Sequence, residues 1–198
     1  HNFQVERLKI LDSLVQSDKV KSKLFRFLAF EILLNEKPLK EKRIFFEEFK
    51  NISNYNSINN EVEILLKNQS QLSPGNTFPS IKGYDLNGNI RDIMKIYNKK
   101  IIFFWSYDQN AHLNSIYKKI NSLENKYLSY KLISLNINDD FDKWKSNYKP
   151  TNNVIELQTN DFEYMSRKLI LDNLNKVFIV DENNIIQAIG SINDFIRN

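Results

Sequence analysis

The feature that most constrains the fold of this chain is an unbroken apolar run, Ile-Ile-Phe-Phe-Trp, at residues 101–105. Five residues suit a β-strand, and a run without polar residues is typical of a strand that is covered on both faces. Such a strand needs helices on each side of its sheet. Residues 106–112 are mostly polar, and a helical pattern begins at Leu113. The sequence therefore predicts an α/β domain built around residues 101–105.

Strand and helix patterns alternate through the rest of this region. The predicted elements are helices at residues 113–127, 139–148 and 162–171, strands at 130–137, 177–180 and 185–189, and a short helix from Ser191. The last two strands flank a polar turn, which is typical of a hairpin. Strands that alternate with helices and end in an antiparallel hairpin indicate a mixed sheet flanked by helices.

The first 72 residues carry helical periodicity instead. Apolar residues recur at three- and four-residue spacing, which predicts helices at residues 3–15, 20–33, 40–49 and 61–66. Ser73-Pro74-Gly75 then breaks the pattern. We therefore predict a helical N-terminal unit at residues 1–72 and a second domain at residues 73–198. The phenylalanines of the helical unit are expected in its core, with either Phe45 or Phe46 covering the junction with the second domain.

Composition excludes several classes of protein. The net charge of +4 is spread among acidic residues, and no basic stripe with interleaved aromatic residues favours nucleic-acid binding. The richest apolar stretch, residues 24–34, is broken by Arg26 and Glu31, so we expect no transmembrane segment. The chain begins with His1 rather than Met, which is typical of a processed or trimmed chain. No export signal is present in it, and composition alone leaves its compartment open.

Several short motifs follow one another in the order found in a known family. Residues 74–198 resemble the TlpA/ResA-type thioredoxin-like domains of the bacterial cell envelope, which are thiol–disulfide oxidoreductases. The matching segments are residues 74–79, residues 84–88, Phe104-Trp105-Ser106 and residues 177–181. The resemblance implies a thioredoxin-like mixed sheet flanked by helices. It also implies an exported protein of the periplasm or cell envelope, since some exported members carry a similar helical segment before this domain.

The sequence departs from this family at the positions that carry its chemistry. Gln109 and His112 stand where the family has its two redox cysteines, and the chain contains no cysteine at all. Asn175 stands where the family has a cis-proline, and a cis bond before a residue other than proline costs about 2.5–4 kcal/mol. Because disulfide exchange needs a thiolate, we expect no oxidoreductase activity, no catalytic residue in that role, no cofactor and a trans peptide bond at Asn175.

Asp108 and His112 leave two interpretations open. Their four-residue spacing could place them on one helix face, as an Asp–His dyad or as two ligands of a metal site. Alternatively, Asp108 caps the following helix and His112 is a packing residue. We favour the second interpretation and expect no metal site, because two ligands are too few. Three aspartates at positions 139, 140 and 142 could hold a cation, but a solvated helix start is the favoured interpretation.

The favoured function is that of a redox-inactive thioredoxin-fold protein that binds or scaffolds a protein or peptide partner. The candidate binding residues are Tyr107, Asp108, Gln109, Asn110, His112 and Asn175. One alternative is an enzyme that uses Asp108 and His112 in hydrolytic or metal-assisted chemistry. Another is a structural subunit that docks through its helical unit. The identity of the partner and the oligomeric state stay open.

Overall fold

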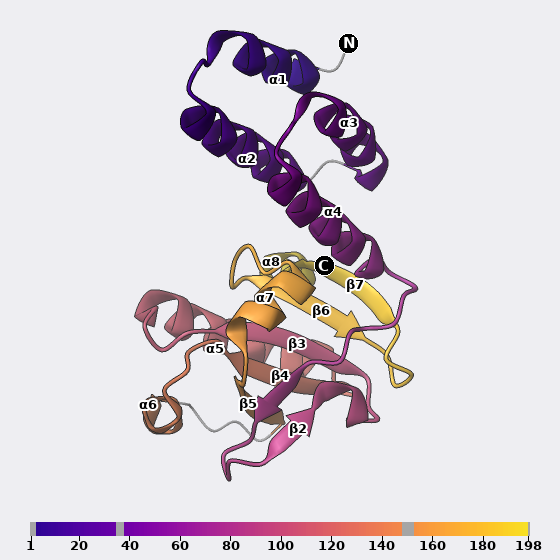
Figure 1. The fold of residues 1–198 in the computed structure, drawn as a ribbon. Helices are drawn as coiled ribbons and strands as arrows, with labels where there is room; N and C mark the ends of the chain where they lie inside the picture. The colour runs from indigo at the N-terminus through magenta and orange to yellow at the C-terminus, as the bar shows by residue number, and fades with distance from the viewer. Residues whose placement is uncertain (1–2, 35–37, 148–152, 198) are drawn as a thin grey trace. The chain divides into compact units, whose positions relative to one another are not determined.

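The computed structural model describes residues 3–34, 38–147 and 153–197 of the chain. They form two compact units, His1–Ser70 and Gln71–Asn198, each with a hydrophobic core of its own. The first unit is helical and the second is built on a β-sheet (Figure 1).

The helical unit contains four helices, as its periodicity predicts. They are α1 (Phe3–Leu14), α2 (Asp18–Leu34), α3 (Leu39–Ile52) and α4 (Asn56–Gln71). Their apolar faces enclose a core that is rich in phenylalanine. Helix α4 begins earlier than predicted, because polar residues 56–60 carry little periodic signal.

The expectation that only one of Phe45 and Phe46 faces the core of the helical unit is wrong. Both rings are buried in the core of the helical unit, with their centroids 5.0 Å apart and their planes at 78°. Helix α3 contacts both α1 and α2. A helix that is covered from two directions can bury neighbouring residues about 100° apart around its axis, so both rings fit into the core of the helical unit.

The second unit contains a seven-stranded mixed sheet, in agreement with the prediction. Its strands are β1 (Lys82–Tyr84), β2 (Ile90–Asp92), β3 (Lys100–Trp105), β4 (Lys131–Asn136), β5 (Val154–Thr159), β6 (Lys176–Val180) and β7 (Ile186–Ser191), in the order β2-β1-β5-β4-β3-β6-β7. The three central strands β3, β4 and β5 are parallel, while β1 and β6 run antiparallel to their central neighbours.

Helices cover both faces of this sheet. Those of the second unit are α5 (Asn110–Lys126), α6 (Phe141–Asn147), α7 (Phe162–Leu169) and α8 (Ile192–Arg197), together with the short 3-10 helix η1 (Ile93–Lys95). Helices α5, α6 and α8 pack on the face that holds Trp105, and α7 packs on the face that holds Phe104 (Figure 1). Trp105 of β3 and Trp144 of α6 are both fully buried in the first of these layers.

Strand β5, like β1, β2 and η1, is absent from the predicted elements. On one face it carries Glu156 and Gln158, which are typical of solvent-exposed positions, yet both side chains are buried.

The limits of the helices differ slightly from those predicted. Helix α7 ends at Leu169 because Ile170 adopts a left-handed conformation with φ of 46°. Tyr148, the last residue of the predicted helix at 139–148, lies outside the described residues.

Candidate functional site

The three positions that distinguish this chain from the family meet at one edge of the sheet. Parallel strands present their carboxyl ends at the same edge, and α5 begins there directly after β3. Strand β6 enters at this edge, with Val177 opposite Phe103. Continuing that antiparallel register by two residues places Asn175 opposite Trp105, next to the loop that leads to Gln109 and His112.

Gln109 and Asn110 are exposed at the start of α5. Gln109 is the N-cap residue, but its side chain makes no capping hydrogen bond, and Asn110 is the first helical residue. Both side chains therefore present amide groups to the surroundings, each with two donors and an acceptor. The expectation that Asp108 caps this helix is wrong.

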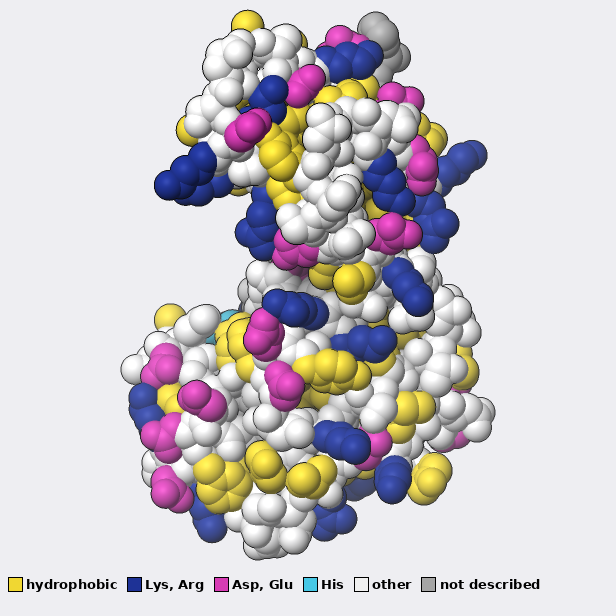
Figure 2. All heavy atoms as spheres, viewed as in Figure 1, with side chains coloured by type: hydrophobic (Ala, Val, Ile, Leu, Met, Phe, Trp, Pro, Cys, Tyr) yellow, Lys and Arg dark blue, Asp and Glu magenta, His cyan; other side chains and the backbone are white. Residues whose placement is uncertain are grey.

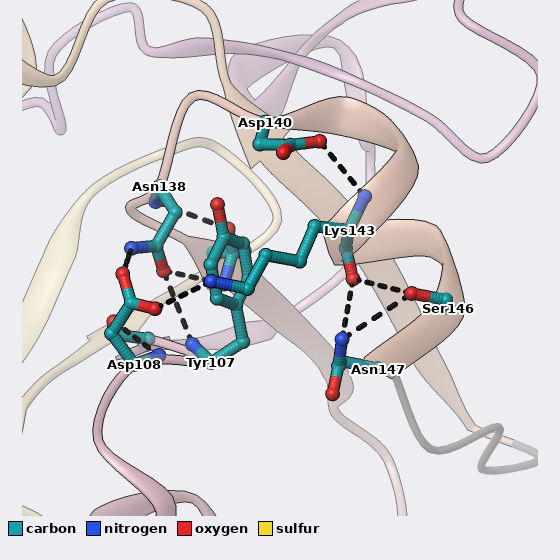
Figure 3. A network of polar contacts seen from close by, with 9 residues as sticks. Tyr107, Asp108, Asn138, Asp140, Lys143, Ser146 and Asn147 are labelled. Carbon is teal, nitrogen blue, oxygen red and sulfur yellow. Dashed lines mark hydrogen bonds and ion pairs between the residues drawn. The ribbon is translucent and has the colours of Figure 1, made fainter.

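Asp108 turns toward α6 instead. Its Oδ1 accepts a hydrogen bond from Lys143 Nζ at 2.8 Å, and its Oδ2 accepts one from Asn138 Nδ2 at 2.8 Å (Figure 3). The ion pair with Lys143 is largely exposed. Because Asp108 binds these two groups, and neither ring nitrogen of His112 has a hydrogen-bond partner, the structure forms no Asp–His dyad.

Asn138 holds the two loops of this edge together (Figure 3). Its Oδ1 accepts from the main-chain N–H of Tyr107 at 3.1 Å, and its own carbonyl oxygen accepts from Gln158 Nε2 at 2.7 Å. Its main-chain N–H donates to Asn136 Oδ1 at 3.1 Å. Asn138 and Lys143 were not predicted from the sequence as parts of this edge. The position of Asn138 in the sequence could have identified it. It directly follows a predicted strand, at the edge where polar side chains of parallel strands meet.

Tyr107 is not part of the exposed surface. Its side chain is buried among the residues between the sheet and α5, and burial raises the pKa of its phenol. Lys143 Nζ lies 4.3 Å from the centre of its ring, a cation–π geometry. Tyr107 therefore supports the edge from within and offers little surface to a partner.

His112 and Asn175 are both half-buried, and the chain segments that carry them lie next to each other. Burial lowers the pKa of the His112 imidazole, while the nearby carbonyl of Leu174 partly offsets this shift without forming a hydrogen bond. The carbonyl oxygen of Asn175 accepts from Ile192 N at 2.8 Å, and its N–H donates to Asn173 Oδ1 at 3.0 Å. Every peptide bond in the described segments is trans. These contacts fit a packing role for His112.

The described residues contain no group of three or more potential metal ligands from His, Cys, Asp and Glu. At the aspartate cluster, Asp140 Oδ1 accepts from the main-chain N–H of Lys143 at 2.9 Å, the contact expected at a helix start. In the same described segments, no helix has the length and apolar character needed to cross a membrane.

Sequence comparison finds no relative, whereas structural comparison finds many. No family model matches the chain, and no curated protein matches it. A thioredoxin-like protein from Bacteroides caccae matches with a TM-score of 0.66 and 13% identity, covering 98% of this chain and 75% of the other. The C-terminal domain of an uncharacterized Bacteroides fragilis protein matches with a TM-score of 0.54 and 12% identity, covering 64% and 96%.

Another match is the thioredoxin domain of a thiol-disulfide oxidoreductase from Bacteroides vulgatus, with a TM-score of 0.46 and 18% identity, covering 63% of this chain and 94% of that one. The strand order, the parallel central strands and the first of these likenesses establish the fold. Because disulfide exchange requires a cysteine thiolate and the sequence has no cysteine, this chain has a thioredoxin-like fold without the groups that exchange disulfides.

Proposed function

We propose that this protein binds a polypeptide at the edge where α5 begins, in place of the disulfide chemistry of the fold. The observation that carries the proposal is that Gln109 and Asn110 are exposed there while the loop beneath them is held by Asn138 and Asp108. Amide side chains can pair with both N–H and C=O groups of an extended peptide. A loop that is already ordered loses less entropy on binding.

The cell envelope is the compartment that we propose. The resemblance to exported TlpA/ResA-type domains supports it. Fractionation of cells that express the natural gene tests it, and recovery of the protein from the cytoplasm alone would contradict it.

A random peptide library displayed on phage tests the binding proposal. We expect selected peptides to lose affinity at least tenfold with Gln109→Ala, Asn110→Ala or Asn175→Ala. The matched control is Asn183→Ala, an exposed amide in the β6–β7 turn, which should leave affinity unchanged. Selected peptides that bind all four variants equally would overturn the proposal. Insulin reduction by the same protein should show no turnover above background.

A second candidate function is supported by the exposed face of the helical unit. Helix α1 presents Phe3, Ile10 and Leu14 in one row with Arg7, and α2 presents Val20, Phe27 and Leu34 in one row with Glu31. Phe27 is 66% exposed and Leu14 is 74% exposed, and Figure 2 shows hydrophobic side chains at the surface of the helical unit. Arg7 and Glu31 form a bidentate ion pair at 3.0 and 3.1 Å. Because this pair joins one member of each row, the two apolar rows lie side by side.

We propose that a second copy of this chain covers these rows. Their exposed apolar area is on the order of 600 Å², large for a monomer and close to the share of one partner in a standard interface of about 800 Å² per side. The paired Arg7 and Glu31 give the face no net charge that would favour a charged partner. Light scattering should give twice the mass of one chain, and Phe27→Glu should halve it. Leu128→Glu, on an exposed loop of the other unit, is the control, and a monomeric natural chain would overturn this candidate.

A further inference from the structure

A carboxyl group is buried between the sheet and α5. Glu156, on β5, is only 7% exposed. Its Oε1 accepts a hydrogen bond from the Tyr117 hydroxyl at 3.2 Å, while its Oε2 has no hydrogen-bond partner. The paired position on β4 is Ser134. A carboxyl group with one unsatisfied oxygen in an apolar layer is costly when it is charged, so its protonation state matters to the packing around it.

This carboxyl group is connected to both elements that carry the proposed binding edge. Ser134, which lies opposite Glu156 in the register of β4 and β5, accepts a hydrogen bond from Trp105 Nε1 at 2.6 Å. Trp105 is the last residue of β3, directly before the loop that leads to Gln109. Tyr117 belongs to α5, and its ring packs edge-on against Trp105 with centroids 6.1 Å apart. Glu156 therefore contacts the end of β3 through one partner and the body of α5 through the other.

The surroundings of Glu156 place its titration in the physiological range. Burial raises its pKa to about 7, and the hydroxyl groups of Ser134 and Tyr117 only partly oppose this shift. The elements packed on this layer present Tyr117 from α5, Trp105 from β3, Ser134 from β4 and Trp144 from α6. Tyr117 is the one titratable group among these four side chains, and no charged group contributes to the shift. A change of pH around 7 therefore changes the charge of this layer through Glu156.

We propose that the proton of Glu156 controls how firmly α5 is held on the sheet, and thereby makes the binding edge at its start sensitive to pH. When the carboxyl group is protonated, the layer is neutral and α5 packs on it. When the proton leaves, the buried charge draws water or donors toward Oε2, and the hydrogen bonds of Tyr117 and Ser134 rearrange with it. The proposal rests on the proposed binding function, since the regulated surface is the one that begins at Gln109.

Nuclear magnetic resonance of the full chain without any peptide tests the switch directly. We expect the side-chain carboxyl of Glu156 to titrate with a midpoint near 7, and the amide protection of residues 110–117 to fall through the same midpoint. In Glu156→Gln, that protection should not change between pH 6 and 8 beyond the intrinsic pH dependence of exchange. The matched control is Glu163→Gln on the exposed face of α7, which should keep the natural profile.

Tyr117→Phe provides a second variant that keeps the carboxyl group. It removes a donor to the ionised form, so the midpoint should move upward. A Glu156 midpoint near the ordinary value of 4.5, or a pH profile of α5 that is the same in Glu156→Gln, would overturn the proposal. Peptide binding is measured separately. A Glu156-dependent profile in a protein that binds no selected peptide would refute the proposed binding function and leave the control of α5 established.

Discussion

The two faces of the sheet differ in chemistry although they share the same strands. The face under α7 is lined by apolar side chains such as Phe104, Leu157 and Phe178. The face under α5 and α6 adds four buried polar residues to its apolar core, in paired positions of β4 and β5: Ser134 with Glu156, and Asn136 with Gln158. The polar face leads to the edge that carries the candidate site. An apolar layer gains stability from burial alone, whereas buried polar groups cost free energy unless they are hydrogen-bonded.

The largest effect is expected on the apolar face. Phe104→Ala removes a fully buried ring that packs edge-on against Phe178 with centroids 6.2 Å apart. The lost burial and the resulting cavity should lower the free energy of unfolding by about 3–5 kcal/mol. Urea denaturation at pH 7 measures this change. Phe162→Ala, at a position that is partly exposed, is the matched control. A loss below about 1 kcal/mol at Phe104 would break the comparison.

On the polar face, a substitution is expected to stabilise the protein. The pKa of Glu156 is about 7 in the folded state against an ordinary value of 4.5. As pH rises, the unfolded chain loses its proton first, so folded-state stability falls between about pH 4.5 and 7 and stays low above that. The full difference is roughly 3 kcal/mol. Glu156→Gln should therefore be about 1–3 kcal/mol more stable than the natural chain at pH 8, with no gain at pH 4.5.

Urea denaturation at these two pH values measures the effect. Glu163→Gln, on the surface, should change stability little at either pH. A Glu156→Gln variant that is destabilised equally at pH 4.5 and pH 8 would show that the carboxyl group is needed for packing rather than tolerated as a titrating group.

A smaller effect is expected at the loop junction. Asn138→Ala removes the acceptor of the Tyr107 N–H and the donor to Asp108. Two hydrogen bonds of this kind should cost about 1–2 kcal/mol of stability. Hydrogen exchange of residues 106–109 should become faster, while exchange in β7 should not change. Asn147→Ala, at an exposed amide of the neighbouring helix α6, is the control. Unchanged exchange at residues 106–109 would show that Asn138 does not order this loop.

The smallest effect is expected at Lys143. Its ion pair with Asp108 is largely exposed, and such pairs contribute at most about 1 kcal/mol. Lys143→Ala should therefore change the unfolding free energy by less than that, and added salt should shrink the difference further. Lys145→Ala, on the same helix, is the matched control. A loss above about 2 kcal/mol would mean that the contact of Lys143 with the Tyr107 ring matters more than the ion pair.

The outline of the fold followed from the sequence because apolar periodicity reports burial directly. The run at residues 101–105 and the alternating segments after it correctly predicted a mixed sheet flanked by helices. Apolar periodicity failed to predict burial where a polar side chain is buried or an apolar side chain is exposed. Strand β5 was missed because Glu156 and Gln158 are polar and buried. Conversely, Phe27 was expected in the core and is exposed, because a helical row of apolar residues does not say whether another element covers it.

The candidate site stays a prediction, and most of its contacts were not predicted. The resemblance to TlpA/ResA-type domains singled out Gln109, His112 and Asn175, whose segments lie at one edge of the sheet. Four-residue spacing suggested an Asp108–His112 pair, yet Asp108 binds Asn138 and Lys143, which are about thirty residues away in the chain. The spacing of residues along one helix does not reveal a hydrogen-bond partner that the fold supplies from another helix or loop.

The absence of cysteine by itself determined that this protein cannot exchange disulfides, because that chemistry depends on one atom type, which a sequence either contains or lacks. Only the tertiary structure decided which polar groups are buried together and which loop Asn138 secures. Both features depend on distances between residues that are far apart in the chain. These distances determine which groups form hydrogen bonds and which lose contact with water, and thereby the charge of Glu156 near neutral pH.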